Sequence, residues 1–260
     1  TTPNLINGTI YRLTLNGRDL AGNLSGVVYR NMNYDIKNPE LSIIYPLDKP
    51  ENNNTDIGYE LSEQLGSATI TYTWLNGTED GNSPHIINID QRSLPEGTTE
   101  RYPLNPAPFL VDGASYKIEF EGVDRAGNKS NISIRNSMVY DITKPTLSIR
   151  APKQGLVHIG KEISYSISED LFESEVIWNR VGGNTDKNSP HIITLSDEEK
   201  LEGDYELVVL DNTSDLLSST TYNVTLKGID PAGNESEPLV INNVDYVRSI
   251  DGQWIFKGAV

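Results

Sequence analysis

The chain has 260 residues, which is enough for one large domain or for two to three ordinary ones. Its net charge of −16 and the lack of any Lys/Arg cluster argue against partners such as nucleic acid or an anionic membrane surface, and no apolar run is long enough for membrane insertion. The absence of cysteine excludes disulfides, thiolate metal sites and cysteine nucleophiles, and it is compatible with export.

An internal repeat governs the order of the predicted elements. An Asp-x-Ala-Gly-Asn turn occurs at 19–23, 124–128 and 230–234, so its Asp residues are separated by 105 (124 − 19) and 106 (230 − 124) positions. A tyrosine stands eight positions before each of these Asp residues. Two further blocks return after 106 positions, which makes coincidence untenable. These blocks are Asn-Ser-Pro-His at 82–85 and 188–191, and Tyr-Asp-Ile at 34–36 and 140–142.

The repeat markers divide the chain into four parts. Residues 1–38 are predicted to be the C-terminal part, namely the last two strands, of a truncated repeat. Residues 39–144 and 145–247 are two complete repeats, and 248–260 is a tail or the start of a different module. Two strands alone are marginally stable, so we expect those of the first part to continue upstream or to pack on a neighbour.

Each repeat has the pattern of an all-β domain. Short runs with period-two alternation are separated by turns rich in Gly, Pro, Asn and Asp. In Ala68–Trp74, Ile70, Tyr72 and Trp74 fall on one face and threonines on the other, and in the next repeat Val176 and Trp178 are predicted to point inward.

Three tyrosines begin the strand that leads to each turn, and each sits at a position typical of a tyrosine corner. They are Tyr11, Tyr116 and Tyr222. Repeats of about 105 residues with some seven strands favour tandem immunoglobulin-like β-sandwich domains arranged as an elongated rod.

The Asp-x-Ala-Gly-Asn turn, the Tyr-Asp-x-x-x-Pro linker and the period near 105 together resemble bacterial Ig-like tandem repeats of large surface or exported adhesin-type proteins. The resemblance covers roughly residues 5–247. It implies the same fold, an extracellular or cell-surface location, and calcium sites that stiffen the rod at domain junctions.

The repeated turn has two interpretations. The simpler one is a tight turn in which Gly127 and Asn128 adopt left-handed backbone conformations. In the other, Asp124, Asn128 and the linker carboxylate Asp141 supply the oxygen ligands that Ca²⁺ prefers.

The same candidate metal ligands recur in the other repeats. In the first they are Asp19, Asn23 and Asp35, and in the last they are Asp230 and Asn234. The linker carboxylate of the last repeat is displaced to Asp245, and this displacement predicts an altered or missing site there.

His85 and His191 occupy equivalent positions in the Asn-Ser-Pro-His block. No carboxylate, Ser or second His is recognised at ligand or triad spacing, and catalytic residues are seldom duplicated in each module of an array. We therefore expect structural hydrogen bonds for both, and no enzyme activity.

The expected function is that of a structural or adhesive segment of an exported repeat protein, acting as a stalk or a fibre. Its partners would be neighbouring repeats of the same chain, other copies in a fibre, and a surface receptor or glycan. The alternative is a carbohydrate-binding or accessory domain of a secreted hydrolase, which exposed aromatic side chains in a row would favour.

Overall fold

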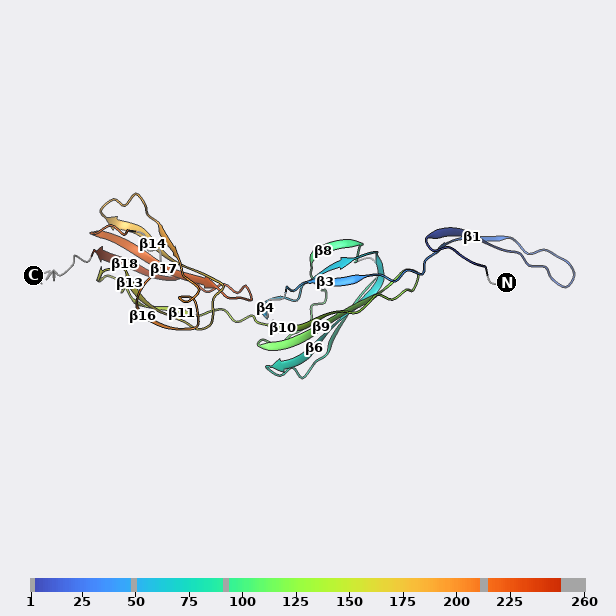
Figure 1. The fold of residues 1–260 in the computed structure, drawn as a ribbon, viewed down its shortest axis with the longest axis horizontal. Coiled ribbons are helices and arrows are strands. Elements are labelled where there is room, and N and C mark those ends of the chain that lie inside the picture. Colours follow the sequence, from blue (N-terminus) through green and yellow to red (C-terminus); the bar gives the residue numbers. More distant parts are fainter. Residues whose placement is uncertain (1–2, 48–50, 91–93, 211–214, 249–260) are drawn as a thin grey trace, which may run out of the picture. The chain divides into compact units, whose positions relative to one another are not determined.

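In the computed structural model, the described residues are 3–47, 51–90, 94–210 and 215–248, and their regular structure consists of strands (Figure 1). This confirms the all-β prediction. No helix that could cross a membrane is found in this part of the chain. The predicted tail lies almost wholly outside the described residues.

The chain forms two compact units. The first contains residues 1–50 and 54–140, and the second contains 51–53 and 141–260. The N-terminal strands are thus grouped with the first unit, and the repeat boundaries remain predictions. A short strand, β4 (Glu51–Asn52), belongs to the second unit.

The first unit contains an N-terminal hairpin and a sandwich of two antiparallel sheets (Figure 1). The hairpin consists of β1 (Thr9–Leu15) and β2 (Val28–Tyr34). One sheet has the order β3 (Leu41–Tyr45), β5 (Ile57–Leu61) and β8 (Gly97–Tyr102). In the other sheet, these four strands lie side by side in the order β10 (Ser133–Tyr140), β9 (Ala114–Asp124), β6 (Leu65–Gly77) and β7 (His85–Ile89).

The core of the first sandwich follows the period-two alternation. Ile70 and Tyr72 of β6 are fully buried, Trp74 packs against the same core, and the intervening threonines are only partly buried. The predicted inward face of this strand is confirmed. Tyr59 of β5 meets Phe120 of β9 edge to face at 5.9 Å, so the two sheets interdigitate through aromatic side chains.

The second unit has the same arrangement. One sheet has the order β11 (Leu147–Ala151), β13 (Glu162–Ile167) and β16 (Gly203–Val209). The other has the order β12 (Val157–Ile159), β18 (Leu239–Val247), β17 (Thr220–Ile229), β14 (Glu173–Gly183) and β15 (His191–Thr194). As predicted, Val176 and Trp178 of β14 are buried in its core.

The three predicted tyrosine corners are confirmed. The hydroxyl oxygen of Tyr116 accepts the backbone N–H of Val111, five residues upstream, at 2.9 Å. Tyr11 and Tyr222 accept the N–H groups of the residues at the same separation, at 2.7 and 3.0 Å. Each corner fixes the point at which the chain enters the strand that leads to the Asp-x-Ala-Gly-Asn turn.

Candidate metal centres

The Asp-x-Ala-Gly-Asn turn is held by its own aspartate. Asp124 Oδ1 accepts the backbone N–H groups of Ala126, Gly127 and Asn128 at 2.7, 2.7 and 2.9 Å. Asn128 Nδ2 donates to Asp124 Oδ2 at 2.8 Å. Gly127 has φ of +97°, a conformation that glycine adopts without strain, whereas Asn128, which was also expected to be left-handed, has no positive φ. The tight-turn interpretation therefore accounts for most hydrogen bonds of this motif.

The hydrogen bonds keep this carboxylate ionised. Burial of Asp124 opposes ionisation, but the bonds from Asn128, Gly127 and Ala126 outweigh it and lower the pKa of Asp124. In the exposed first copy of the turn, hydrogen bonds from Asn23 likewise lower the pKa of Asp19. The turn of the first sandwich thus presents a negative charge at one end of that sandwich.

Two groups of three carboxylates gather at these turns. Asp35, Glu63 and Asp124 each place a carboxylate oxygen within 4.8 Å of the others, and a second group does the same. The second group is Asp141, Glu169 and Asp230. Each of its members lies 106 positions after its counterpart in the first group, so the groups are two copies of one arrangement.

The asparagines of the second and third turns tie the preceding segment to the sandwich. Asn128 Nδ2 donates to the backbone oxygen of Asp35 at 3.2 Å, and Asn234 Nδ2 donates to that of Asp141 at 3.0 Å. These amides act as hydrogen-bond donors toward the segment. The carboxylates of Asp35 and Asp141 each also accept a backbone N–H two residues on, which fixes their direction.

The structure corrects the predicted grouping of ligands. Asp124 was expected to act with Asp141, which follows it, but it lies with Asp35, which precedes it. In the same way Asp141 lies with Asp230. The reason is that the chain enters each sandwich at the end where the turn lies, whereas the strand after the turn runs to the opposite end.

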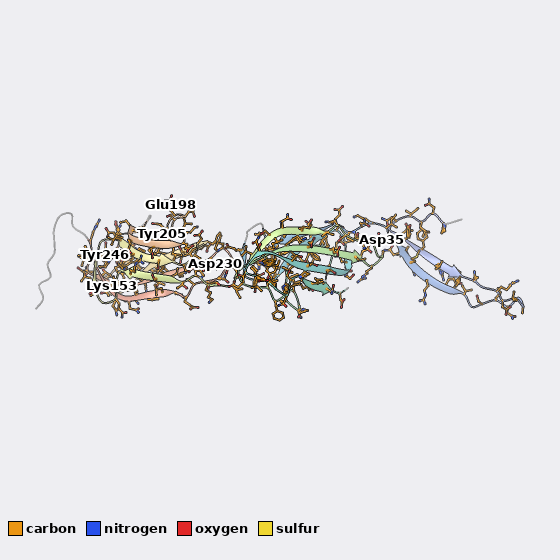
Figure 2. The ribbon with its side chains drawn as sticks, turned by 90° about the horizontal axis from the view of Figure 1, so that it is seen from below. Asp35, Lys153, Glu198, Tyr205, Asp230 and Tyr246 are labelled. Atoms are coloured by element: carbon orange, nitrogen blue, oxygen red, sulfur yellow. The ribbon has the colours of Figure 1, made fainter. Side chains whose placement is uncertain are left out.

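The displacement of Asp245 therefore removes no carboxylate from the last turn. Asp230 lies at one end of the second unit and Tyr246 at the other, as Figure 2 shows. Asp245, next to Tyr246, accepts a hydrogen bond from the Thr221 hydroxyl at 2.7 Å. The last turn has its full set of carboxylates without Asp245, because Asp141 supplies the one from the linker.

Sequence reasoning missed the glutamates of both groups. Glu63 stands in Leu61-Ser-Glu-Gln-Leu65 and Glu169 in Ile167-Ser-Glu-Asp-Leu171, a fourth block that repeats after 106 positions. Each glutamate comes just after the strand β5 or β13, which ends near the turn. The repeated block was the signal that could have identified them.

Crowding of negative charge shifts the pKa values around both groups. Burial, followed by the charges of Asp35 and Asp124, raises the pKa of Glu63, whose Oε1 is buried without a hydrogen-bond partner. Burial and the charges of Asp141 and Asp230 raise the pKa of Glu51 beside the second group. Each group of carboxylates therefore favours a bound proton or a bound cation.

The two histidines lie in a different network. His85 Nε2 and the hydroxyl of Tyr116 contact the same oxygen of Asp80, at 2.6 and 2.7 Å. The second repeat has the same arrangement, in which His191 Nε2 lies 2.6 Å from Asp186 Oδ2. The prediction that no carboxylate stands at ligand or triad spacing from these histidines is wrong, because an Asp precedes each histidine by five positions and contacts it.

This network fits a structural role. The side chain of Asp80 is 1% exposed and that of His85 is 12% exposed, so this contact lies mostly inside the sandwich. Burial opposes ionisation of Asp186, but hydrogen bonds from His191 and Tyr222 lower its pKa to about 2. The charged aspartate anchors the Asn-Ser-Pro-His loop to the tyrosine corner.

A surface groove in the second unit offers a third kind of site. Its lining combines polar and charged residues with Gly228, Ile229 and Pro238, and it includes the ion pairs Lys144–Glu237 and Lys227–Glu175, at 3.1 and 3.0 Å. Among the described residues, its lining has no aromatic side chain. It therefore lacks the flat apolar platform on which a sugar ring stacks.

No protein-family model matches the chain, and no curated protein matches it. Among solved structures, it is similar to fibronectin(III)-like modules of Clostridium thermocellum CbhA, at 13% identity over 79% of this chain and 94% of that chain, with a TM-score of 0.38. It is also similar to the FN1–FN3 domains of chicken CNTN1, at 12% identity over 93% and 80% of the two chains, with a TM-score of 0.38.

A third neighbour is a tetra-tandem repeat in the extending region of a large adhesion protein, at 14% identity over 93% of this chain and 57% of that chain, with a TM-score of 0.28. The neighbours are thus fibronectin-III-like modules and tandem repeats of an adhesion protein. At these scores the likeness carries no argument about function. The architecture of all-β tandem repeats is evident from the strands themselves.

Proposed function

We propose that this chain is a stalk or spacer segment of an exported adhesive protein, and that its repeats bind Ca²⁺ at the two carboxylate groups. The observation that carries the proposal is the recurrence of one three-carboxylate arrangement at a separation of 106 positions. Each group joins a residue of the incoming segment, a glutamate just after β5 or β13, and the Asp of the turn.

The chemistry of the groups suits Ca²⁺. Carboxylate oxygens are hard ligands, and Ca²⁺ tolerates irregular arrangements of six to eight of them. The carboxyl of Glu63 lies beside two other carboxyls and has a raised pKa, so a divalent cation would relieve a repulsion that is already present. Asp124 Oδ2 accepts one hydrogen bond within the turn, from Asn128, so this oxygen keeps a lone pair for a cation.

A structural role follows from where the groups lie in each unit. A cation held by Asp35 and Asp124 would fasten the incoming segment to the sandwich that follows it, in addition to the bond from Asn128. The same holds for Asp141 and Asp230 in the second unit. Fastened segments of this kind would stiffen the chain under load.

The carbohydrate-binding alternative has less support. Large aromatic side chains such as Tyr72, Tyr116 and Trp178 lie in the cores and not in a row on one face. The groove of the second unit has no aromatic side chain among its described lining residues.

The test is thermal unfolding of the whole chain in EDTA and in rising Ca²⁺. At ten times the dissociation constant a single site contributes about 1.4 kcal/mol. For a domain of this size we expect the melting temperature to rise by about 5–10 °C. The double variant Glu63→Gln/Glu169→Gln should lose this shift, since it removes one ligand charge from each group without altering the turns.

A matched control is the double variant Glu60→Gln/Glu198→Gln, which removes two exposed carboxylates elsewhere on the same units. It should respond to Ca²⁺ as the unaltered chain does. An equal response of both double variants, or no response of the unaltered chain, would show that the carboxylate groups do not bind Ca²⁺.

A further inference from the structure

The β1–β2 hairpin exposes side chains whose counterparts are core residues. Leu13 and Leu15 of β1 are 59% and 68% exposed, and Met32 of β2 is 39% exposed. Their counterparts in β9 and β10 are Ile118, Phe120 and Met138, each at most 1% exposed. Within the part of the chain that the structure describes, the hairpin therefore has the apolar face of a sandwich sheet but no sheet that covers it.

We propose that this face binds a segment that precedes residue 5 in the same polypeptide and has the strand pattern of residues 39–109. That segment would complete a sandwich around the hairpin. The other possible occupant, a second copy of this chain, is separated by the experiment below.

The backbone of β1 specifies the first contact. In the first sandwich, β9 pairs with β10 on one side and with β6 on the other, over the register Leu65↔Asp124 to Gly77↔Ala114. Among the described residues, β1 pairs only with β2. Its other edge leaves N–H and C=O groups available for an antiparallel strand like β6.

The tyrosine corner argues that the occupant belongs to the same polypeptide. The N–H of Ile6 donates to the hydroxyl oxygen of Tyr11 at 2.7 Å, and the N–H of Gly8 donates to the backbone carbonyl oxygen of Tyr34 at 2.8 Å. The first sandwich repeats both bonds, at 2.9 and 2.8 Å, where the chain arrives at β9 from the rest of that sandwich. The chain at Ile6 therefore has the path of a chain that comes from the sandwich to which the hairpin belongs.

The occupant also has a predictable charge pattern, which rests on the proposed calcium sites. Asp124 gathers with Asp35 and Glu63, which both precede it in the chain. Asp19 and Asn23 form the same turn as Asp124 and Asn128. The occupant should thus carry an Asp and a Glu that precede Asp19 by the same spacings as Asp35 and Glu63 precede Asp124.

In the experiment, a copy of residues 34–109 is placed directly before Leu5, in place of residues 1–4. Phe109 of the copy is then followed by Leu5, just as Phe109 of the chain is followed by Leu110. Hydrogen exchange is measured in EDTA, which makes the result independent of calcium. We expect the amides of Thr9–Leu15 that face away from β2 to exchange at least about a hundredfold more slowly than in the unextended chain.

Two variants of the extended chain separate packing from a general effect. Leu13→Asp places a charge on the apolar face and should abolish the added protection. Thr14→Asp alters the opposite face, where the counterpart is Glu119, and should retain it. Unchanged exchange in the extended chain, or equal effects of the two variants, would overturn the proposal.

Sedimentation of the unextended chain tests the other occupant. We expect a monomer at micromolar concentration. Dimers that Leu13→Asp abolishes and Thr14→Asp leaves intact would show that a second copy covers the face, and would overturn the proposal.

Discussion

The two sandwiches share strand order, tyrosine corner and carboxylate group, but they distribute core volume differently. The central position of the long strand holds Tyr72 in the first sandwich and Trp178 in the second. On the neighbouring strand of the same sheet, Phe120 of the first is matched by Leu226 of the second. A larger side chain on one strand thus accompanies a smaller one on its neighbour, which is how close packing is kept while single residues change.

The aromatic contacts show the same difference. Trp178 meets Tyr222 and Tyr246 edge to face at 5.9 and 6.3 Å, so it joins three strands of one sheet. Tyr72 meets Tyr116 at 6.5 Å. Trp178 therefore contacts more aromatic rings than Tyr72, its counterpart in the first sandwich.

The largest expected effect comes from removing that residue. Trp178→Ala should destabilise the second sandwich by about 3–5 kcal/mol, because it leaves a large cavity among aromatic rings. Denaturant unfolding followed by hydrogen exchange should show early opening of β14 and β17 and an unchanged first sandwich. Loss of protection in both sandwiches to the same extent would contradict two separate cores.

The next largest effect is expected from the two aspartates that contact the histidines. Asp186→Ala should cost about 2–4 kcal/mol, because it leaves the buried polar groups of His191 and Tyr222 without their shared acceptor. Asp80→Ala should have a similar effect on the first sandwich. Equilibrium unfolding measures both, and an unchanged free energy of unfolding in either variant would show that the network is dispensable.

The free energy of unfolding should depend on pH through the same buried aspartates. The folded pKa of Asp186 is about 2, whereas an unfolded aspartate has about 3.9. A lowered folded pKa contributes stability that is present above the unfolded value and is lost as pH falls, so the loss should occur between about pH 4 and about pH 2. The slope of stability against pH in this window should be smaller in Asp186→Ala than in the unaltered chain.

A smaller effect is expected at the turn. Gly127→Ala should cost about 1 kcal/mol, since nothing lies near the added methyl group and the whole penalty comes from φ of +97°. Gly81→Ala is a suitable control, because that glycine also has open space around it and no positive φ. Equal melting temperatures of the two variants would show that the turn relaxes without cost.

The smallest effect should come from the groove of the second unit. Lys144 pairs with Glu237, but their side chains are 58% and 87% exposed. Lys144→Ala should change the free energy of unfolding by less than about 0.5 kcal/mol. A loss above about 1 kcal/mol, the upper end for exposed pairs, would indicate that this pair does more than an exposed ion pair does.

The sequence by itself determined the all-β class, the period and the inward faces. Local alternation decides which side of a strand is apolar, so Ile70 and Tyr72 could be placed in a core without coordinates. The tyrosine corners were predictable for a related reason, because each is made between groups that are close together in the sequence.

Only the tertiary structure decided which aspartate meets which turn. Asp141 follows Asp124 closely in the sequence, whereas Asp35 lies most of a repeat before it, so proximity in sequence favoured the wrong partner. The choice depends on the end of the sandwich at which the chain enters, which no local pattern records. Glu63 joins the group for the same reason, because the strand before it ends beside a turn that is distant in sequence.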